Sequence, residues 1–78
     1  MKITIKYCGI WEYKPKAQVV SNEILKSYPD VEVILEESDG GRFDVIYEDD
    51  PPGLLFSKDE HNRFPEDGEI IKLIGINE

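Results

Sequence analysis

The chain begins with a segment in which apolar and polar side chains alternate. Over residues 2–7 the apolar positions are Ile3, Ile5 and Tyr7, and a lysine or threonine precedes each of them. A period of two is typical of a strand with one face in the core and the other in solvent. The same alternation recurs over residues 31–36 and 43–48, and a short strand is expected over residues 54–57. The pattern therefore predicts four strands.

A helical spacing follows the first strand. Ala17, Val20 and Ile24 recur at intervals of three and four residues, which places them on one face of a helix. Pro15 suits the first turn of a helix, and Pro29 disfavours helix at the residue before it. We therefore predict a helix that begins near Pro15 and ends before Pro29.

The last third of the chain predicts a charged loop and a second helix. Residues 58–62 form the expected loop, and the helix is expected to begin at Pro65, with Gly68 inside its first turn. The apolar side of this helix would carry Ile70, Leu73 and Ile74. Residues 48–53 form an acidic turn around two prolines, which cannot lie in a central strand.

The resulting order is β-α-β-β-β-α in a single domain over residues 1–78, because a chain this short has no room for two cores. The first two strands, joined through a helix, should be parallel with a right-handed crossover. Short connections make the third and fourth strands antiparallel to their predecessors. Strands with one polar face place both helices on the same side of the sheet. The predicted fold is a two-layer α/β sandwich with a four-stranded mixed sheet.

Charge excludes one large class of function. The chain carries 17 acidic and 9 basic residues, a net charge of -8, and this argues against a nucleic-acid-binding protein. The balance is uneven, since residues 1–28 hold five lysines and two glutamates and so carry a charge of +3. The acidic runs at residues 36–39 and 48–50 lie at two expected turns, over residues 37–41 and 48–53, where carboxylates are usually solvated. His61 stands without a second His or Cys nearby, so we predict no metal site.

The chain contains one cysteine, so no disulfide can form within it. The alternating start lacks the continuous apolar stretch of a signal peptide, and no segment approaches the roughly 20 apolar residues of a membrane span. We therefore expect a cytoplasmic protein with no membrane partner, in which the thiol stays reduced.

The cysteine, Cys8, falls where the first strand ends and the path to the first helix begins. Ligand and redox sites in open α/β sheets favour this edge. Helix amides and the neighbouring Lys6, Lys14 and Lys16 would favour a thiolate there. The alternative is a structural role, because buried cysteines often serve as small core residues.

Residues 7–16, Tyr-Cys-Gly-Ile-Trp-Glu-Tyr-Lys-Pro-Lys, resemble the signature of the selenoprotein W-like (Rdx) family of thioredoxin-like redox proteins. In that family the first strand ends in Tyr-Cys-Gly, and two residues separate the cysteine from a selenocysteine or second cysteine. The similarity extends to the Gly40-Gly41 hairpin, the Leu-Phe-Ser-Lys strand and the closing helix. It implies a thioredoxin-like fold with strand order 2-1-3-4, and a redox function.

One position departs from the family pattern. Cys8 matches the first redox residue, Gly9 and Ile10 fill the spacer, and Trp11 occupies the second redox position. What remains is chemistry of a single thiol, in which Cys8 forms a mixed disulfide with glutathione or a protein partner. Tyr7 and Tyr13 would line the thiol, with Trp11 folded over it or exposed. No resident cofactor is implied, and glutathione would act as a co-substrate.

A second hypothesis treats the chain as a non-catalytic interaction module that has lost the second redox residue. In that case Trp11 and its neighbours would form a docking patch for a protein partner. Ile34 and Ile46, on the otherwise polar sheet face, would allow a weak dimer. The expected assembly is a monomer or a weak dimer.

Overall fold

The computed structural model describes residues 1–10, 13–49 and 52–77. Its elements are the strands β1 (Lys2–Cys8), β2 (Glu32–Ser38), β3 (Phe43–Tyr47) and β4 (Gly53–Ser57), and the helices α1 (Lys14–Ser27), α2 (Lys58–His61) and α3 (Glu69–Asn77). The predicted elements are therefore all present, and α2 is an additional short helix. Residues 50 and 51 of the predicted acidic turn lie outside the described residues. No described helix has the length and apolar character needed to cross a membrane.

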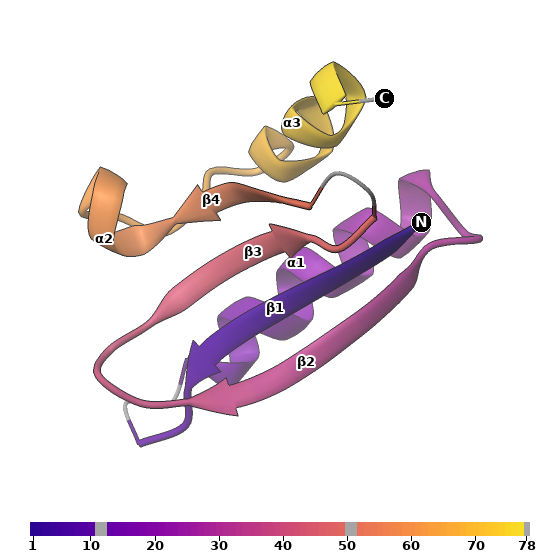
Figure 1. The fold of residues 1–78 in the computed structure, drawn as a ribbon. Helices are drawn as coiled ribbons and strands as arrows, with labels where there is room; N and C mark the ends of the chain where they lie inside the picture. The colour runs from indigo at the N-terminus through magenta and orange to yellow at the C-terminus, as the bar shows by residue number, and fades with distance from the viewer. Residues whose placement is uncertain (11–12, 50–51, 78) are drawn as a thin grey trace.

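The four strands form one sheet in the order β2-β1-β3-β4. β1 and β2 are parallel, and β3 is antiparallel to both β1 and β4. Figure 1 shows α1 crossing behind this sheet. Both the strand directions and the order 2-1-3-4 are as predicted, and the fold is a mixed α/β sandwich of thioredoxin-like type.

A single core joins the sheet to α1 and α3. Its fully enclosed side chains include Ile5 from β1, Phe43 and Val45 from β3, Ile24 from α1 and Ile74 from α3, each 0% exposed. Because residues of both helices share this cluster, α1 and α3 cover the same face of the sheet. The predicted placement of the two helices is confirmed.

Local sequence signals explain where α1 begins and ends. Pro15 lies in its first turn, where a missing amide donor costs no helical hydrogen bond. Tyr28 leaves the helical conformation (φ -133°) before Pro29, and its N–H still donates to the carbonyl of Ile24 over 2.7 Å. Ala17 and Ile24 are buried, as their spacing predicts.

Three boundaries differ from the predictions. β2 continues through Ser38, into the expected turn, because the end of β1 supplies hydrogen-bonding partners there. Most of the expected loop at residues 58–62 forms the helix α2, and Asn62, the residue after the helix, adopts the left-handed conformation (φ 55°). The closing helix begins at Glu69 and not at Pro65, because Gly68 adopts a φ of 79° that a helix cannot contain.

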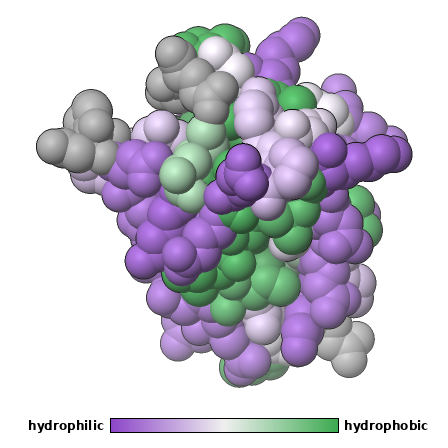
Figure 2. Space-filling view, turned by 90° about the vertical axis from the view of Figure 1, so that its right-hand side faces the viewer, coloured by the Kyte–Doolittle hydropathy of each residue, from purple (hydrophilic) through white to green (hydrophobic). Residues whose placement is uncertain are grey.

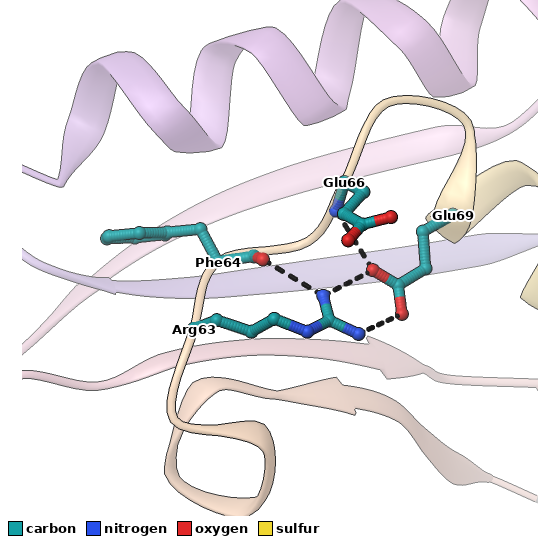
Figure 3. Close-up of polar contacts among 4 residues, drawn as sticks. All are labelled: Arg63, Phe64, Glu66 and Glu69. Carbon is teal, nitrogen blue, oxygen red and sulfur yellow. Dashed lines mark hydrogen bonds and ion pairs between the residues drawn. The ribbon is translucent and has the colours of Figure 1, made fainter.

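A carboxylate stabilises the beginning of α3 (Figure 3). Glu69 accepts two hydrogen bonds from the Arg63 guanidinium, at 2.7 and 2.9 Å, and one from the backbone N–H of Glu66 at 2.9 Å. Arg63 also donates to the carbonyl of Phe64 over 3.1 Å. The hydrogen bonds from Arg63 and then from the Glu66 amide lower the pKa of Glu69 to about 2. This arrangement fastens the 63–68 segment to the helix.

The sheet face opposite the helices is less open to solvent than the alternation predicts. Thr4, in the middle strand, is 3% exposed, and its hydroxyl donates to the Glu48 carboxylate over 2.7 Å. Ile34 and Ile46 are its neighbours on β2 and β3, and both are half-buried. The prediction that this face is in solvent is therefore wrong at Thr4, which lies between Ile34 of β2 and Ile46 of β3.

Candidate functional site

Cys8 is the last residue of β1, at the carboxyl edge of the parallel pair. Its partner across the pair is Ser38, the last residue of β2. Since β1 lies between β2 and β3, the connection of residues 39–42 has to pass the end of β1, as Figure 1 shows at the lower left. Cys8 is 1% exposed and is a free cysteine.

Two backbone hydrogen bonds fasten the chain on leaving Cys8. The N–H of Gly9 donates to the carbonyl of Ser38 over 3.3 Å, which extends the β1–β2 pairing by one bond. The N–H of Tyr13 donates to the carbonyl of Cys8 over 3.1 Å, and α1 begins at the next residue. The thiol-bearing residue is therefore tied by its backbone to the start of α1. Trp11, the second position of the motif, lies outside the described residues.

Acidic side chains stand beside this segment. A Cβ added to Gly9 would clash with the side-chain carboxyl group of Glu37, so the Glu37 side chain would have to move if Gly9 were replaced. Glu37, Ser38 and Asp39 line a shallow cavity of about 350 Å³ together with Ile10, which is 80% exposed. This cavity therefore lies beside the residues that follow Cys8, and Glu37 and Asp39 give it two carboxylates.

The three lysines named from the sequence have different surroundings. The Lys6 ammonium lies 3.6 Å from the carboxylate of Glu36. The Lys16 ammonium lies 5.4 Å from the centre of the Phe64 ring, within the range of a cation–π contact. Lys14, the first residue of α1, is exposed. Lys6 and Lys16 thus engage other side chains of the domain.

The two tyrosines of the motif serve different packing roles. Tyr7 is 5% exposed and belongs to the main core. Tyr13 is half-buried and meets the Phe64 ring edge-on at 4.8 Å, and Phe64 in turn meets Phe43 at 5.2 Å. Lys58 lies over the Tyr13 and Phe64 rings, at 5.7 and 5.6 Å. The beginning of α1 is therefore held against the segment that precedes α3.

The described residues contain no group of three or more His, Cys, Asp or Glu side chains that could hold a metal ion. His61 stacks on the Phe56 ring at 4.7 Å with an angle of 9° between the planes. Arg63 lies over the same ring at 5.5 Å. The structure thus gives His61 a packing contact at the end of α2.

Sequence reasoning did not place Glu37, Ser38 or Phe64 near the thiol end of the sheet. The first two were assigned to a turn, although continuing the parallel register beyond residue 36 sets Ser38 opposite Cys8. Phe64 lies 51 positions beyond Tyr13 in the chain, and no local pattern relates the two residues.

Comparison with known proteins relates this arrangement to a family. The model of the Rdx family matches residues 2–75. A selenoprotein W-related protein from Vibrio cholerae has a crystal structure that is similar with a TM-score of 0.83 and 21% identity, covering 94% of this chain and 90% of that one. A protein from Bordetella parapertussis gives a TM-score of 0.88 and 24% identity, covering 99% and 96%. The search of curated proteins gave no match. At these identities the two structures establish the fold, and the family match over nearly the whole length establishes that the chain belongs to the Rdx family.

Proposed function

We propose that the protein is a redox protein that acts through the single thiol of Cys8, by exchange with a disulfide. Membership of the Rdx family supports a redox function. The observation that carries the finer proposal is the place of Cys8, which ends β1 at the carboxyl edge of the sheet and is hydrogen-bonded through its backbone to the start of α1. The chain has no other cysteine, so a dithiol cycle within one molecule is excluded.

The proposed cycle has two exchange steps. The Cys8 thiolate attacks one sulfur of a disulfide, forms a mixed disulfide with it and releases the other sulfur as a thiolate. A second thiol then attacks the partner's sulfur in the mixed disulfide, which regenerates the Cys8 thiolate and leaves a new disulfide between the two external groups. In the net exchange the second thiol takes the place of the sulfur that left the original disulfide as a thiolate, and the protein is unchanged.

The surroundings of the site favour one kind of partner. Glu37 and Asp39 place carboxylates beside Ile10, two residues after Cys8, and these carboxylates would repel the two carboxylates of glutathione. The exposed Ile10 adds an apolar surface at the same place. A protein thiol or disulfide in a cationic, partly apolar segment fits these neighbours better than glutathione, which stays the alternative co-substrate.

The test is labelling of the native protein. Reaction with iodoacetamide at neutral pH, followed by intact mass, should show one adduct on the folded protein and none on Cys8→Ser. Treatment with an oxidised protein disulfide and, separately, with oxidised glutathione should each give one mixed disulfide, with the former faster. A thiol that reacts only in denaturant would refute the redox proposal.

The second candidate is an interaction module without redox chemistry. The observation that favours it is the 1% exposure of Cys8, which is typical of a structural cysteine. Labelling distinguishes the two candidates, because a module of this kind would keep its fold and its partner binding in Cys8→Ser and would show no native adduct.

A further inference from the structure

The outer edge of β2 is a strand edge that no strand of the described residues covers. β2 is the terminal strand of the sheet and pairs only with β1. The N–H of Glu32 donates inward to Met1, and the carbonyl of Ser38 accepts inward from Gly9. Because backbone groups alternate in direction along a strand, the N–H and C=O groups of Val33, Leu35 and Glu37 point outward.

The side chains along this edge combine an apolar centre with acidic ends. Val33, Ile34 and Leu35 are half-buried, while Glu32 and Glu36 are exposed on either side of them. Figure 2 shows the right-hand side of the view in Figure 1, where a hydrophobic area lies between hydrophilic borders. Natural edge strands are often protected by charge at their ends, but here the centre stays apolar.

The pairing of β1 with the inner edge of β2 shows what kind of strand suits the side chains of β2. β1 pairs with it so that Lys2 lies opposite Glu32 and Lys6 opposite Glu36, with Thr4 opposite Ile34. The Lys6 ammonium lies 3.6 Å from the Glu36 carboxylate. β1, which has a lysine on each side of a short stretch with two isoleucines, therefore already pairs with one edge of β2. A strand at the outer edge of β2 would lie beside the same β2 side chains.

We propose that the outer edge of β2 binds an extended, cationic segment of a partner protein, which adds to the sheet as a fifth strand. The backbone of the segment would pair with the outward groups of Val33, Leu35 and Glu37. Its apolar side chains would cover the apolar centre of the edge, and its Lys or Arg side chains would lie beside Glu32, Glu36 and Glu37. The edge ends at Ser38, one strand away from Cys8, so the segment runs toward the thiol end of the sheet.

A second copy of this chain fits the edge less well. The antiparallel register that matches Val33 with Leu35 of a second copy, and Ile34 with its own counterpart, places Glu32 opposite Glu36 at both ends. Like charges directly opposite one another destabilise a strand pair. The net charge of -8 on each molecule adds to this repulsion.

The test uses the whole protein and a capped peptide, Lys-Lys-Val-Thr-Val-Lys, designed to run antiparallel to β2 from Glu37 to Glu32. Bound peptide should slow the hydrogen exchange of the Val33, Leu35 and Glu37 amides, measured by nuclear magnetic resonance. The amides of Ile34 and Glu36 point inward toward β1 and should change little. The Cys8→Ser variant should bind equally, so a failure of the thiol chemistry would leave this result unchanged.

Two control peptides separate strand addition from attraction of charge alone. N-methylation of alternate residues keeps the charge but removes backbone donors, and it should abolish the protection. Replacing the three lysines by glutamates should weaken binding by about tenfold or more at low salt, because the loss of each exposed lysine–glutamate pair lowers the affinity by a few-fold. The proposal is overturned if no peptide binds, or if the methylated peptide slows the exchange of these amides equally. It is also overturned if the changes in the nuclear magnetic resonance spectrum map to Thr4 and Ile46. A protein whose amides at Val33, Leu35 and Glu37 are already protected by pairing with a second copy would overturn it too.

Discussion

Gly40→Ala tests how the enclosed thiol becomes accessible. Gly40 lies in the connection that passes the end of β1, it has a φ of 72°, and a Cβ added to it meets nothing within 4 Å. An alanine there would make no clash, but it would have to adopt the left-handed conformation, at a cost of about 1 kcal/mol. If this connection has to open before Cys8 reacts, opening relieves the strain. The population of the open form, and with it the rate of alkylation, should then rise about fivefold.

Gly68→Ala provides a matched control. Gly68 has a φ of 79° and also has nothing within 4 Å of an added Cβ, but it precedes α3, in a different part of the chain. Both variants should lose about the same free energy of unfolding, because both strain one residue in the same way. If labelling needs only the local opening of the 39–42 connection, it should be faster in Gly40→Ala and unchanged in Gly68→Ala.

The assay is the rate of iodoacetamide labelling of Cys8 under native conditions, together with urea denaturation of both variants. Equal acceleration in the two variants would mean that labelling occurs through global unfolding. No acceleration in either would mean that the thiol is reached by another route, such as the segment between Cys8 and α1. Either result would refute the reasoning that the 39–42 connection limits access.

Two further predictions concern stability. Ile74→Ala should lower the free energy of unfolding by about 2–5 kcal/mol, because Ile74 is 0% exposed. Ile76 is 74% exposed, so Ile76→Ala should change the free energy of unfolding by less than about 0.5 kcal/mol. Equal losses in urea denaturation would mean that the buried face of α3 is assigned wrongly. Glu69→Gln should lower the melting temperature at pH 7 by a few degrees, since the pKa of Glu69 is lowered to about 2 from an ordinary 4.5. The contribution of Glu69 is fully present above about pH 4.5 and is lost as the pH falls through about 2, so the two melting temperatures should converge there, and a constant difference would contradict the assignment.

Periodicity in the sequence was enough to predict most of this fold. The alternation of Ile3, Ile5 and Tyr7 and the helical spacing of Ala17, Val20 and Ile24 each identify side chains that are buried in the structure. These patterns are strong because they record which face of an element meets the core. The position of Cys8 at the end of the first strand followed from the same patterns.

What the sequence did not reveal depends on contacts between distant residues. Glu37 and Ser38 read as turn residues beside two glycines, and they become part of β2 because β1 extends far enough to pair with them. The short helix α2 ends at His61, and the His61 ring stacks on Phe56, a contact that no local pattern indicates. The same holds for Lys16, whose ammonium lies near the ring of Phe64, a residue from a distant part of the chain.

The strand order brings a connection past the end of β1 that carries the thiol. With β1 between β2 and β3, the chain has to cross the carboxyl end of β1 to pass from one neighbour to the other. In this chain the connection contains Gly40 and Gly41, both at positive φ. Two left-handed residues in succession let the chain reverse within a few positions and stay close to the end of β1. We therefore expect the reactivity of Cys8 to depend on how often this connection opens, which the labelling rate of Gly40→Ala measures.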